Sequence, residues 1–475
     1  MFTLILILVC VIFLVKLFIS RNDGRNFKEI PGPKGLPVFG NIQDYFLTDE
    51  KLWIESRARA LEFYPIYKLK TLNKTIVHIV DPKDAEVVLS NPRYMTKGDT
   101  YGPFKVWMGN GLLVTEGEIW RKSRKLLTKC FHFNALRNKL DLLNSAALKL
   151  ASILSDDNEK PTDLVKHLGR HSLRVAIASF VGEKPEVKND AAKQFLKALQ
   201  TLTKITTYKI FLPILKYLYL FTSMKREEDK AVKIFHGFTS YLIEGNSNLD
   251  ITENSDETRL LNVLLTNFQG QQVKDHLNTI LFGGQDSTST ALSFILYVLS
   301  NKQHFQDELY NEIMEVTSDG RPSFGEINQM NLLDRFVKEC FRLYPPAHFV
   351  GRHINEKVPL PSGYTIPAGA MTLIHIYDIH HNPKIYPEPD KFDPDRFLPE
   401  NIQKRHPFSF IPFSAGPRNC IAQKFALLSI KTALCGLLTK FRIEPVGSLE
   451  DIVLIPDILL KTKYPLKVIF RPRIT

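Results

Sequence analysis

One cysteine lies where a helix is predicted to begin. Cys420 follows residues 413–419 (FSAGPRN) and precedes an apolar helical stretch at 423–440. The unpaired N–H groups and the positive dipole end of a helix N-terminus favour a thiolate there. Gly416 permits a tight turn beside a ligand, and Arg418 offers donors to a carboxylate. Together they suit haem, with sulfur on iron and Arg418 on a propionate. The alternative is an inert thiol, which Cys420 alone would favour.

A second pattern lies inside a long predicted helix at residues 273–299. Adjacent glycines at 283–284 each destabilise a helix interior by about 1 kcal/mol relative to alanine, so their presence requires a structural explanation. Either the backbone approaches another group closely, or the helix opens locally. Asp286, Ser287 and Thr288 follow, and an acid beside two hydroxyls can transfer protons. A helix cap at this point fits poorly, because apolar periodicity continues on both sides.

Two further pairs of residues have helical spacing. Glu339 and Arg342 are three positions apart, so they share a helix face and can form an ion pair. Trp120 and Arg124 are one helical turn apart and also share a face. An isolated Glu/Arg pair at this spacing is most often a solvated helix surface, so the interpretation depends on the order and spacing of the motifs along the chain.

In this order the motifs resemble those of the cytochrome P450 family, the haem-thiolate monooxygenases. The family signature F-x-x-G-x-R-x-C-x-G is matched at Phe413, Gly416, Arg418 and Cys420, and Ala422 stands where glycine is usual. An alanine adds one methyl group near the haem face and should be tolerated. The resemblance implies that Cys420 is the axial ligand of the haem iron.

The resemblance also implies roles for residues outside this loop. Glu339 and Arg342 form the family's E-x-x-R, and Arg396 lies in its P-x-R-F element. These three are expected to form a buried network that braces the cysteine loop. Residues expected to contact the haem, chiefly its propionates, are Trp120, Arg124, Arg352 and Arg418.

The two-glycine helix resembles the oxygen-side helix of the family, whose pattern is [A/G]-G-x-[D/E]-T-[T/S]. Ser287 replaces the usual threonine and keeps its hydroxyl, so Asp286, Ser287 and Thr288 are expected to deliver protons to bound O₂. Residues 273–286 are most similar to family four, the fatty-acid ω-hydroxylase branch. That branch often carries a glutamate that bonds to the haem where this chain has Gly283, so we expect non-covalent haem b.

The N-terminal segment predicts a membrane anchor. Residues 2–19 are almost entirely apolar, and roughly 18–20 residues at about 1.5 Å each cross a hydrocarbon layer of about 30 Å. Basic residues follow this stretch, which predicts a cytosolic catalytic domain on the endoplasmic reticulum membrane. A cleaved signal peptide is the alternative, but no basic region precedes the stretch and no A-x-A site follows it.

Composition and periodicity predict a mainly α fold with a small β portion. The chain has 475 residues, 44% hydrophobic and 24% charged, with five cysteines and no CxxC pair. This excludes a disordered chain or a disulfide scaffold. Strands are predicted at 66–80, 370–377 and 452–471, with a long ordered loop at 378–419. The predicted organisation is an anchor (1–20), a Pro/Gly-rich connector (21–40) and a cytochrome P450 haem domain (41–475).

The predicted activity is insertion of one oxygen atom of O₂ into a lipophilic substrate. A fatty acid or related lipid, oxidised at the ω-position, and a xenobiotic remain open as substrates. No flavin domain or dinucleotide motif is present, so NADPH-cytochrome P450 reductase is the expected electron donor, with cytochrome b5 as a second partner. A basic cluster near Trp120 could dock either one. The formal charge of +12 also suits anionic lipid, whereas no nucleic-acid recognition module is present.

Several alternatives stay open. A hydroperoxide isomerase of the same fold would need neither O₂ nor a reductase, and a haem sensor or carrier would have no turnover. An apolar and aromatic stretch at 205–221 is expected either to dip into the membrane or to form a core helix. By resemblance, the substrate pocket is expected to be lined from 104–113, 281–282, 349–350 and 455–458.

Overall fold

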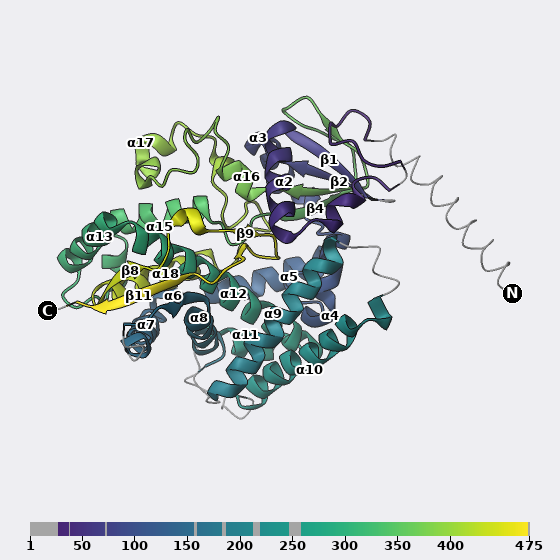
Figure 1. Ribbon diagram of the computed structural model, residues 1–475. Coiled ribbons are helices and arrows are strands. Elements are labelled where there is room, and N and C mark those ends of the chain that lie inside the picture. Colours follow the sequence, from purple (N-terminus) through teal and green to yellow (C-terminus); the bar gives the residue numbers. More distant parts are fainter. Residues whose placement is uncertain are drawn as a thin grey trace. The chain divides into compact units, whose positions relative to one another are not determined.

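The computed structural model describes residues 27–37, 39–71, 74–155, 159–182, 187–211, 219–246 and 258–473 (Figure 1). The chain divides into two units, each assembled from separate stretches. Unit 1 comprises Met1–Thr100, His348–Asp390 and Arg405–Asn419. Unit 2 comprises Tyr101–Ala347, Lys391–Lys404 and Cys420–Thr475.

Unit 1 is built on a four-stranded sheet in the order β1-β2-β7-β4. Its strands are β1 (Ile66–Thr71), β2 (Lys74–Ile79), β4 (Val350–Ile354) and β7 (Ala370–Ile374). β1 and β2 pair antiparallel, which confirms the predicted hairpin, and β2 pairs parallel with β7. The unit also contains η1 (Ile42–Phe46), α2 (Asp49–Glu62), α3 (Pro82–Ser90), η2 (Pro92–Tyr94), β5 (Val358–Pro359), β6 (Thr365–Ile366), α16 (Ile376–His380) and η8 (Pro407–Ser409).

The strand predicted at 370–377 is too long. β7 ends at Ile374, and α16 begins at Ile376. Ile376 and Ile379 are both fully buried, three positions apart. That spacing places both side chains on one helix face, whereas a strand would turn one of them away from the core.

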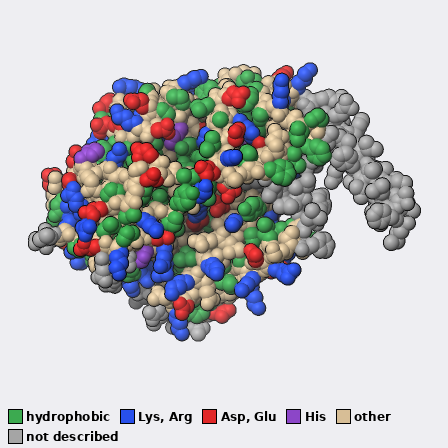
Figure 2. All heavy atoms as spheres, viewed as in Figure 1, with side chains coloured by type: hydrophobic (Ala, Val, Ile, Leu, Met, Phe, Trp, Pro, Cys, Tyr) green, Lys and Arg blue, Asp and Glu red, His purple; other side chains and the backbone are tan. Residues whose placement is uncertain are grey.

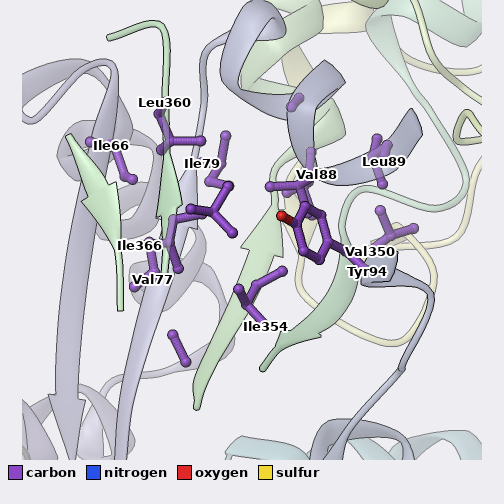
Figure 3. Close-up of a cluster of buried hydrophobic side chains, with 14 of the residues drawn as sticks. Ile66, Val77, Ile79, Val88, Leu89, Tyr94, Val350, Ile354, Leu360 and Ile366 are labelled. Atoms are coloured by element: carbon purple, nitrogen blue, oxygen red, sulfur yellow. The ribbon is translucent and has the colours of Figure 1, made fainter. Parts of the chain in front are cut away.

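The core of unit 1 fills the space between the sheet and α3. Ile66, Val77 and Ile79 of the first hairpin pack with Val88 of α3 and Ile354 of β4, and all are almost completely buried (Figure 3). α3 begins where the Asp81 carboxylate accepts hydrogen bonds from the N–H groups of Lys83 and Asp84, with a proline in the first turn. The helix is therefore held in position directly after β2.

Unit 2 is mainly helical and surrounds one long helix, α12 (Gln271–Asn301). Helices α8 (Leu164–Phe180), α10 (Ser223–Glu244), α15 (Asn331–Leu343) and α18 (Gln423–Leu438) all pack against α12. The other helices are η3 (Asp99–Phe104, beginning in unit 1), α4 (Lys105–Met108), α5 (Gly117–Thr128), η4 (Lys129–Phe131), α6 (Phe133–Arg137), α7 (Leu140–Ser155), α9 (Asn189–Phe211), η6 (Tyr219–Phe221), α11 (Leu260–Asn267), α13 (Gln303–Val316), α14 (Phe324–Ile327), η7 (Pro394–Phe397), α17 (Pro399–Ile402) and η9 (Leu449–Asp451).

The strands of unit 2 come mostly from the C-terminal part of the chain. β3 (Thr162–Asp163), β11 (Lys467–Pro472) and β8 (Phe441–Pro445) form a three-stranded sheet, and β9 (Leu454–Ile455) pairs with β10 (Lys461–Thr462). The predicted loop at 378–419 is irregular for most of its length. It also contains the end of α16 and three short helices, each with a proline in its first turn.

The predicted membrane anchor, residues 1–20, lies outside the described residues, as do positions 212–218 of the apolar stretch. Among the helices that the structure describes, none combines the length and the apolar composition needed to cross a bilayer. The described part of the apolar stretch consists of the last turns of α9 and of η6.

Candidate functional site

Cys420 opens the last stretch of unit 2, just before α18. The sulfur accepts a hydrogen bond from the N–H of Ala422, and the positive charge of Arg124 also lowers the pKa of the thiol. Burial is the larger effect, so the pKa of Cys420 is raised overall, although part of the side chain is exposed. α18 starts only at Gln423, so the helix N-terminus favours the thiolate less than its sequence position suggested. Coordination to a metal would supply the missing stabilisation.

The loop that precedes Cys420 belongs to unit 1, and Gly416 determines its path. Gly416 has φ +72°, and a Cβ atom there would overlap the carbonyl oxygen of Leu89. Both the backbone conformation and the close approach therefore require glycine. Arg418 is nearly buried and donates from Nε to the carbonyl oxygen of Met95 at 3.2 Å. Phe413 lies half-buried in the same loop.

Trp120 and Arg124 lie on α5, as the one-turn spacing predicted. Trp120 is buried, and Arg124 is half-buried. Burial lowers the pKa of Arg124, and the charge of the Cys420 thiolate opposes this change. α5 therefore places a guanidinium within electrostatic range of the cysteine, inside unit 2.

α12 is buried around its circumference except at one point. Between Asp275 and Ser300, where every residue is described, only Gly283, Gly284 and Ser287 are not buried. The helix continues through both glycines as a regular α-helix, so the local opening proposed for them is absent. At Gly284 a Cβ atom would lie 3.3 Å from the Ala176 Cβ of α8, whereas at Gly283 it would meet nothing within 4 Å.

The two positions therefore carry glycine for different structural reasons. Gly284 permits the close approach of α8, the alternative that the sequence left open. Gly283 is exposed, and Ser287 lies one turn further along the same side of α12. Together Gly283 and Ser287 form the uncovered face of the helix.

The polar residues after the glycines have different environments. Ser287 Oγ donates a hydrogen bond to the Gly283 carbonyl oxygen at 2.5 Å, the common contact of a serine inside a helix. Thr288 is buried. The Asp286 carboxylate pairs with Lys461 of β10, with 2.6 Å between Nζ and Oδ1. Sequence reasoning missed Lys461, because no local pattern links residues that lie 175 positions apart.

Glu339 and Arg342 form a fully buried, two-hydrogen-bond pair on α15. Arg342 donates from Nε and Nη2 to the two carboxylate oxygens of Glu339 at 2.7 and 2.8 Å. Glu339 also accepts from the Asp393 N–H at 2.9 Å, and Arg396 Nε lies 3.6 Å from its Oε1. Arg342 Nη2 donates to the Lys391 carbonyl oxygen at 3.2 Å. The structure thus brings the three residues of the expected network together.

Arg352 lies in unit 1 on β4, where its side chain is almost completely buried. It donates from Nη1 to the neighbouring Gly351 carbonyl oxygen at 2.8 Å. Of the three arginines expected to contact haem, Arg352 and Arg418 therefore lie in unit 1, and Arg124 lies in unit 2.

The segment expected to line a substrate pocket, 104–113, packs against α12. Trp107 is fully buried, with its ring centroid 5.2 Å from that of Phe282 and 5.4 Å from that of Phe235. The Asp275 carboxylate of α12 accepts from the Asn110 N–H at 2.8 Å and fastens the turn after Trp107 to the helix. The aromatic residues here form a buried cluster beside the uncovered face, since Phe282 directly precedes Gly283.

The residues of unit 2 fit a flat, iron-containing cofactor. Cys420 offers one soft ligand atom, which would suit an iron that a porphyrin supplies with four nitrogen ligands. No group of three His, Cys, Asp or Glu side chains within the described ranges could hold a bare metal ion. Gly283 projects no side chain from the uncovered face of α12, and Arg124 supplies a cation for an anionic substituent. The donor set and the lack of a side chain at Gly283 therefore suit haem.

Comparison with known proteins agrees with this chemistry. A family model described as Cytochrome P450 matches residues 30–470. Cytochrome P450 4c21 of Blattella germanica is 30% identical over an alignment that covers 94% of this chain and 95% of the relative. Cytochrome P450 4d2 of Drosophila melanogaster is 29% identical, covering 90% of this chain and 91% of that protein. Probable cytochrome P450 4ac3 of the same organism is 31% identical, covering 84% and 81%. The chain therefore belongs to the cytochrome P450 family, within its family four, and is a monooxygenase that binds haem b non-covalently through a cysteine thiolate.

Proposed function

We propose that this monooxygenase hydroxylates a lipophilic substrate, a fatty acid or related lipid, at or near its ω-carbon. The observation that carries the proposal is the combination, within unit 2, of the Cys420 thiol within electrostatic range of Arg124 and a helix that is buried between Asp275 and Ser300 except around the face formed by Gly283 and Ser287. The similarity of residues 273–286 to the fatty-acid ω-hydroxylase branch supports the substrate class.

In this proposal the Cys420 sulfur would bind the haem iron. Haem bound through a thiolate supplies the activation of O₂ that insertion into a C–H bond requires. Within unit 2 the candidate partner of a haem propionate is Arg124, with Trp120 one helical turn before it on α5. Within unit 1 the candidate partners are Arg352 and Arg418. Guanidinium groups suit this role because their planar donors match a carboxylate.

The proposed proton supply uses Asp286, Ser287 and Thr288. The Ser287 hydroxyl donates a hydrogen bond to the Gly283 carbonyl oxygen. The lone pairs of this hydroxyl remain able to accept a proton from a water. Passing a proton onward requires the hydroxyl to rotate away from Gly283. Thr288 holds a second hydroxyl on the next residue, and Asp286 is the acid that can exchange protons with them.

The proposed electron donor is NADPH-cytochrome P450 reductase, with cytochrome b5 as a second partner. Four basic side chains near Trp120 are exposed and could dock an acidic partner: Arg121, Lys122, Lys125 and Lys129. Glu118 pairs with Arg121 at 2.6 Å, so part of this charge is neutralised. On the face that Figure 2 shows, Lys and Arg side chains are interspersed with Asp and Glu, so neither sign dominates that view.

The proposed location is the endoplasmic reticulum membrane. Residues 1–20 would form a single anchor, residues 21–40 a stiff connector, and residues 41–475 the haem domain on the cytosolic side. The basic residues that follow the apolar segment support this orientation. A membrane location also suits a substrate that partitions into lipid.

Reconstitution tests the proposal directly. The purified full chain would be combined with the reductase and NADPH, and fatty acids of several chain lengths would be supplied as substrates. Mass spectrometry should find hydroxylation at or near the terminal carbon. NADPH consumption with no acyl product would contradict the proposed substrate class. Product formed from a fatty-acid hydroperoxide without NADPH would instead support a rearrangement enzyme.

A further inference from the structure

The C-terminal hairpin β9–β10 is fastened to α12 by one lysine. Lys461 Nζ lies 2.6 Å from Asp286 Oδ1 and 3.5 Å from Thr290 Oγ1, one turn further along α12. The Lys461 and Asp286 side chains are 27% and 12% exposed. The pair is therefore partly shielded from water, where an ion pair contributes more than it does on an open surface.

A second polar contact fastens the turn of the same hairpin. The Asp457 carboxylate accepts hydrogen bonds from Thr207 Oγ1 of α9 and from the N–H of Ile458. Burial raises the pKa of Asp457, the hydrogen bond from Thr207 lowers it, and the nearby charge of Lys461 lowers it further. Lys461 therefore lies in the field of two carboxylates, one on the hairpin and one on α12.

The ion pair limits how Asp286 can move. Asp286 directly precedes Ser287, which lies on the uncovered face of α12, and a single carboxylate oxygen is held by Lys461. An aspartate anchored at Oδ1 keeps one side-chain orientation and leaves Oδ2 as its proton-exchanging atom. A displacement of the hairpin would release the carboxylate and change that orientation.

We propose that Lys461 is a positioning residue for Asp286, through which the place of the C-terminal hairpin controls proton supply at α12. The inference rests on the proposed function, in which Asp286 exchanges protons with the hydroxyls that follow it. It adds a residue from outside α12, and the hairpin that carries this residue, to that proton supply.

Lys461→Met tests this proposal, because methionine keeps the aliphatic stem and removes the charge. The variant is assayed as the full-chain holoenzyme with reductase, NADPH and a substrate that the protein hydroxylates. We expect peroxide released per product to rise about fivefold, a change typical of losing a partly shielded ion pair. Lys461→Arg should restore the wild-type ratio, since it keeps the cation.

A second measurement does not depend on activity. Hydrogen–deuterium exchange of the amides at 454–463 should accelerate about fivefold in Lys461→Met and equally in Asp286→Asn. The double variant should exchange no faster than either single one, because both changes remove the same interaction. Lys431→Met is the matched control, since Lys431 pairs with Asp334 at 2.7 Å elsewhere in unit 2. It should leave both peroxide release and hairpin exchange unchanged.

The outcomes separate this inference from the proposed function. If Asp286→Asn raises peroxide release while Lys461→Met does not, Asp286 supplies protons without Lys461 and the inference is wrong. If hairpin exchange in Lys461→Met equals that of the wild type, the ion pair does not hold the hairpin, and the inference is again wrong. If Asp286→Asn leaves coupling unchanged, the proposed role of Asp286 itself fails.

Discussion

Replacing Arg342 by methionine should destabilise the protein more than any surface substitution on α15. Arg342 makes two hydrogen bonds to Glu339 at 2.7 and 2.8 Å, and neither side chain is exposed. Methionine is apolar and leaves the Glu339 carboxylate buried. That carboxylate keeps only the Asp393 N–H at 2.9 Å and Arg396 Nε at 3.6 Å as the partners described above.

The expected magnitude follows from these contacts. A hydrogen bond to a charged group contributes about 1.5–3 kcal/mol, so two of them are worth about 3–6 kcal/mol. Removing one partner of a buried ion pair costs about 3–5 kcal/mol. Because the hydrogen bond from the Asp393 N–H and the nearby charge of Arg396 remain on Glu339, we expect a loss of about 3–4 kcal/mol in the free energy of unfolding.

Arg335→Met is the matched control. Arg335 also lies on α15 and forms an ion pair with Asp395 of η7 at 3.1 Å. The two side chains are 22% and 66% exposed, unlike the buried Glu339 and Arg342. Its loss should cost less than about 1 kcal/mol. Urea unfolding followed by circular dichroism measures both variants, provided that the slope with denaturant is unchanged. If both variants lost the same small free energy of unfolding, the buried Glu339–Arg342 network would not stabilise the protein to the expected extent.

The same purified variants report on the cysteine loop. If the Glu339 network braces that loop, Arg342→Met should lose the spectrum of thiolate-ligated, carbon-monoxide-bound reduced haem at urea concentrations that leave Arg335→Met intact. A thiolate spectrum that persists to the same urea concentration in both variants would separate the network from the loop.

Three further predictions concern single positions. Gly416→Ala places a Cβ against the Leu89 carbonyl oxygen, so the thiolate spectrum of reduced, carbon-monoxide-bound protein should fall severalfold; Gly325→Ala, with nothing within 4 Å of the added Cβ, should retain it. After turnover with reductase, NADPH and O₂, which supplies the two-electron oxidation, the Gly283→Glu carboxylate should replace a hydrogen of a haem methyl group and form an ester, so acid acetone should no longer extract the haem; full extraction from a folded variant after turnover would contradict the placement of Gly283 against haem. Burial lowers the pKa of His78 well below 6.5, so the folded state binds fewer protons than the unfolded state below that pH, and stability falls as pH falls. His78→Phe should remove about 1.4 kcal/mol per pH unit of that slope, measured by urea unfolding between about pH 4 and 6, whereas an unchanged slope would show that His78 takes up no proton on unfolding.

The sequence predicted those features of the site that depend on neighbours in the chain. The turn at Gly416, the spacing of Trp120 and Arg124, and the pairing of Glu339 with Arg342 all follow from loop or helix geometry over a few residues. Gly284 is an intermediate case, because its need for a close neighbour was predictable but the neighbour, Ala176 of α8, was not.

The family follows from the residues of the chain alone, and so does the proposed chemistry, in which Cys420 is the thiol ligand and the arginines and Asp286, Ser287 and Thr288 serve the haem and its proton supply. Residue types and short spacings are written directly in the chain, and local backbone geometry converts them into shared faces. The packing of the elements, in contrast, leaves α12 uncovered at a single face between Asp275 and Ser300 and pairs Lys461 with Asp286. Burial and long-range ion pairs depend on which elements pack together, and that packing is a property of the whole fold rather than of any segment.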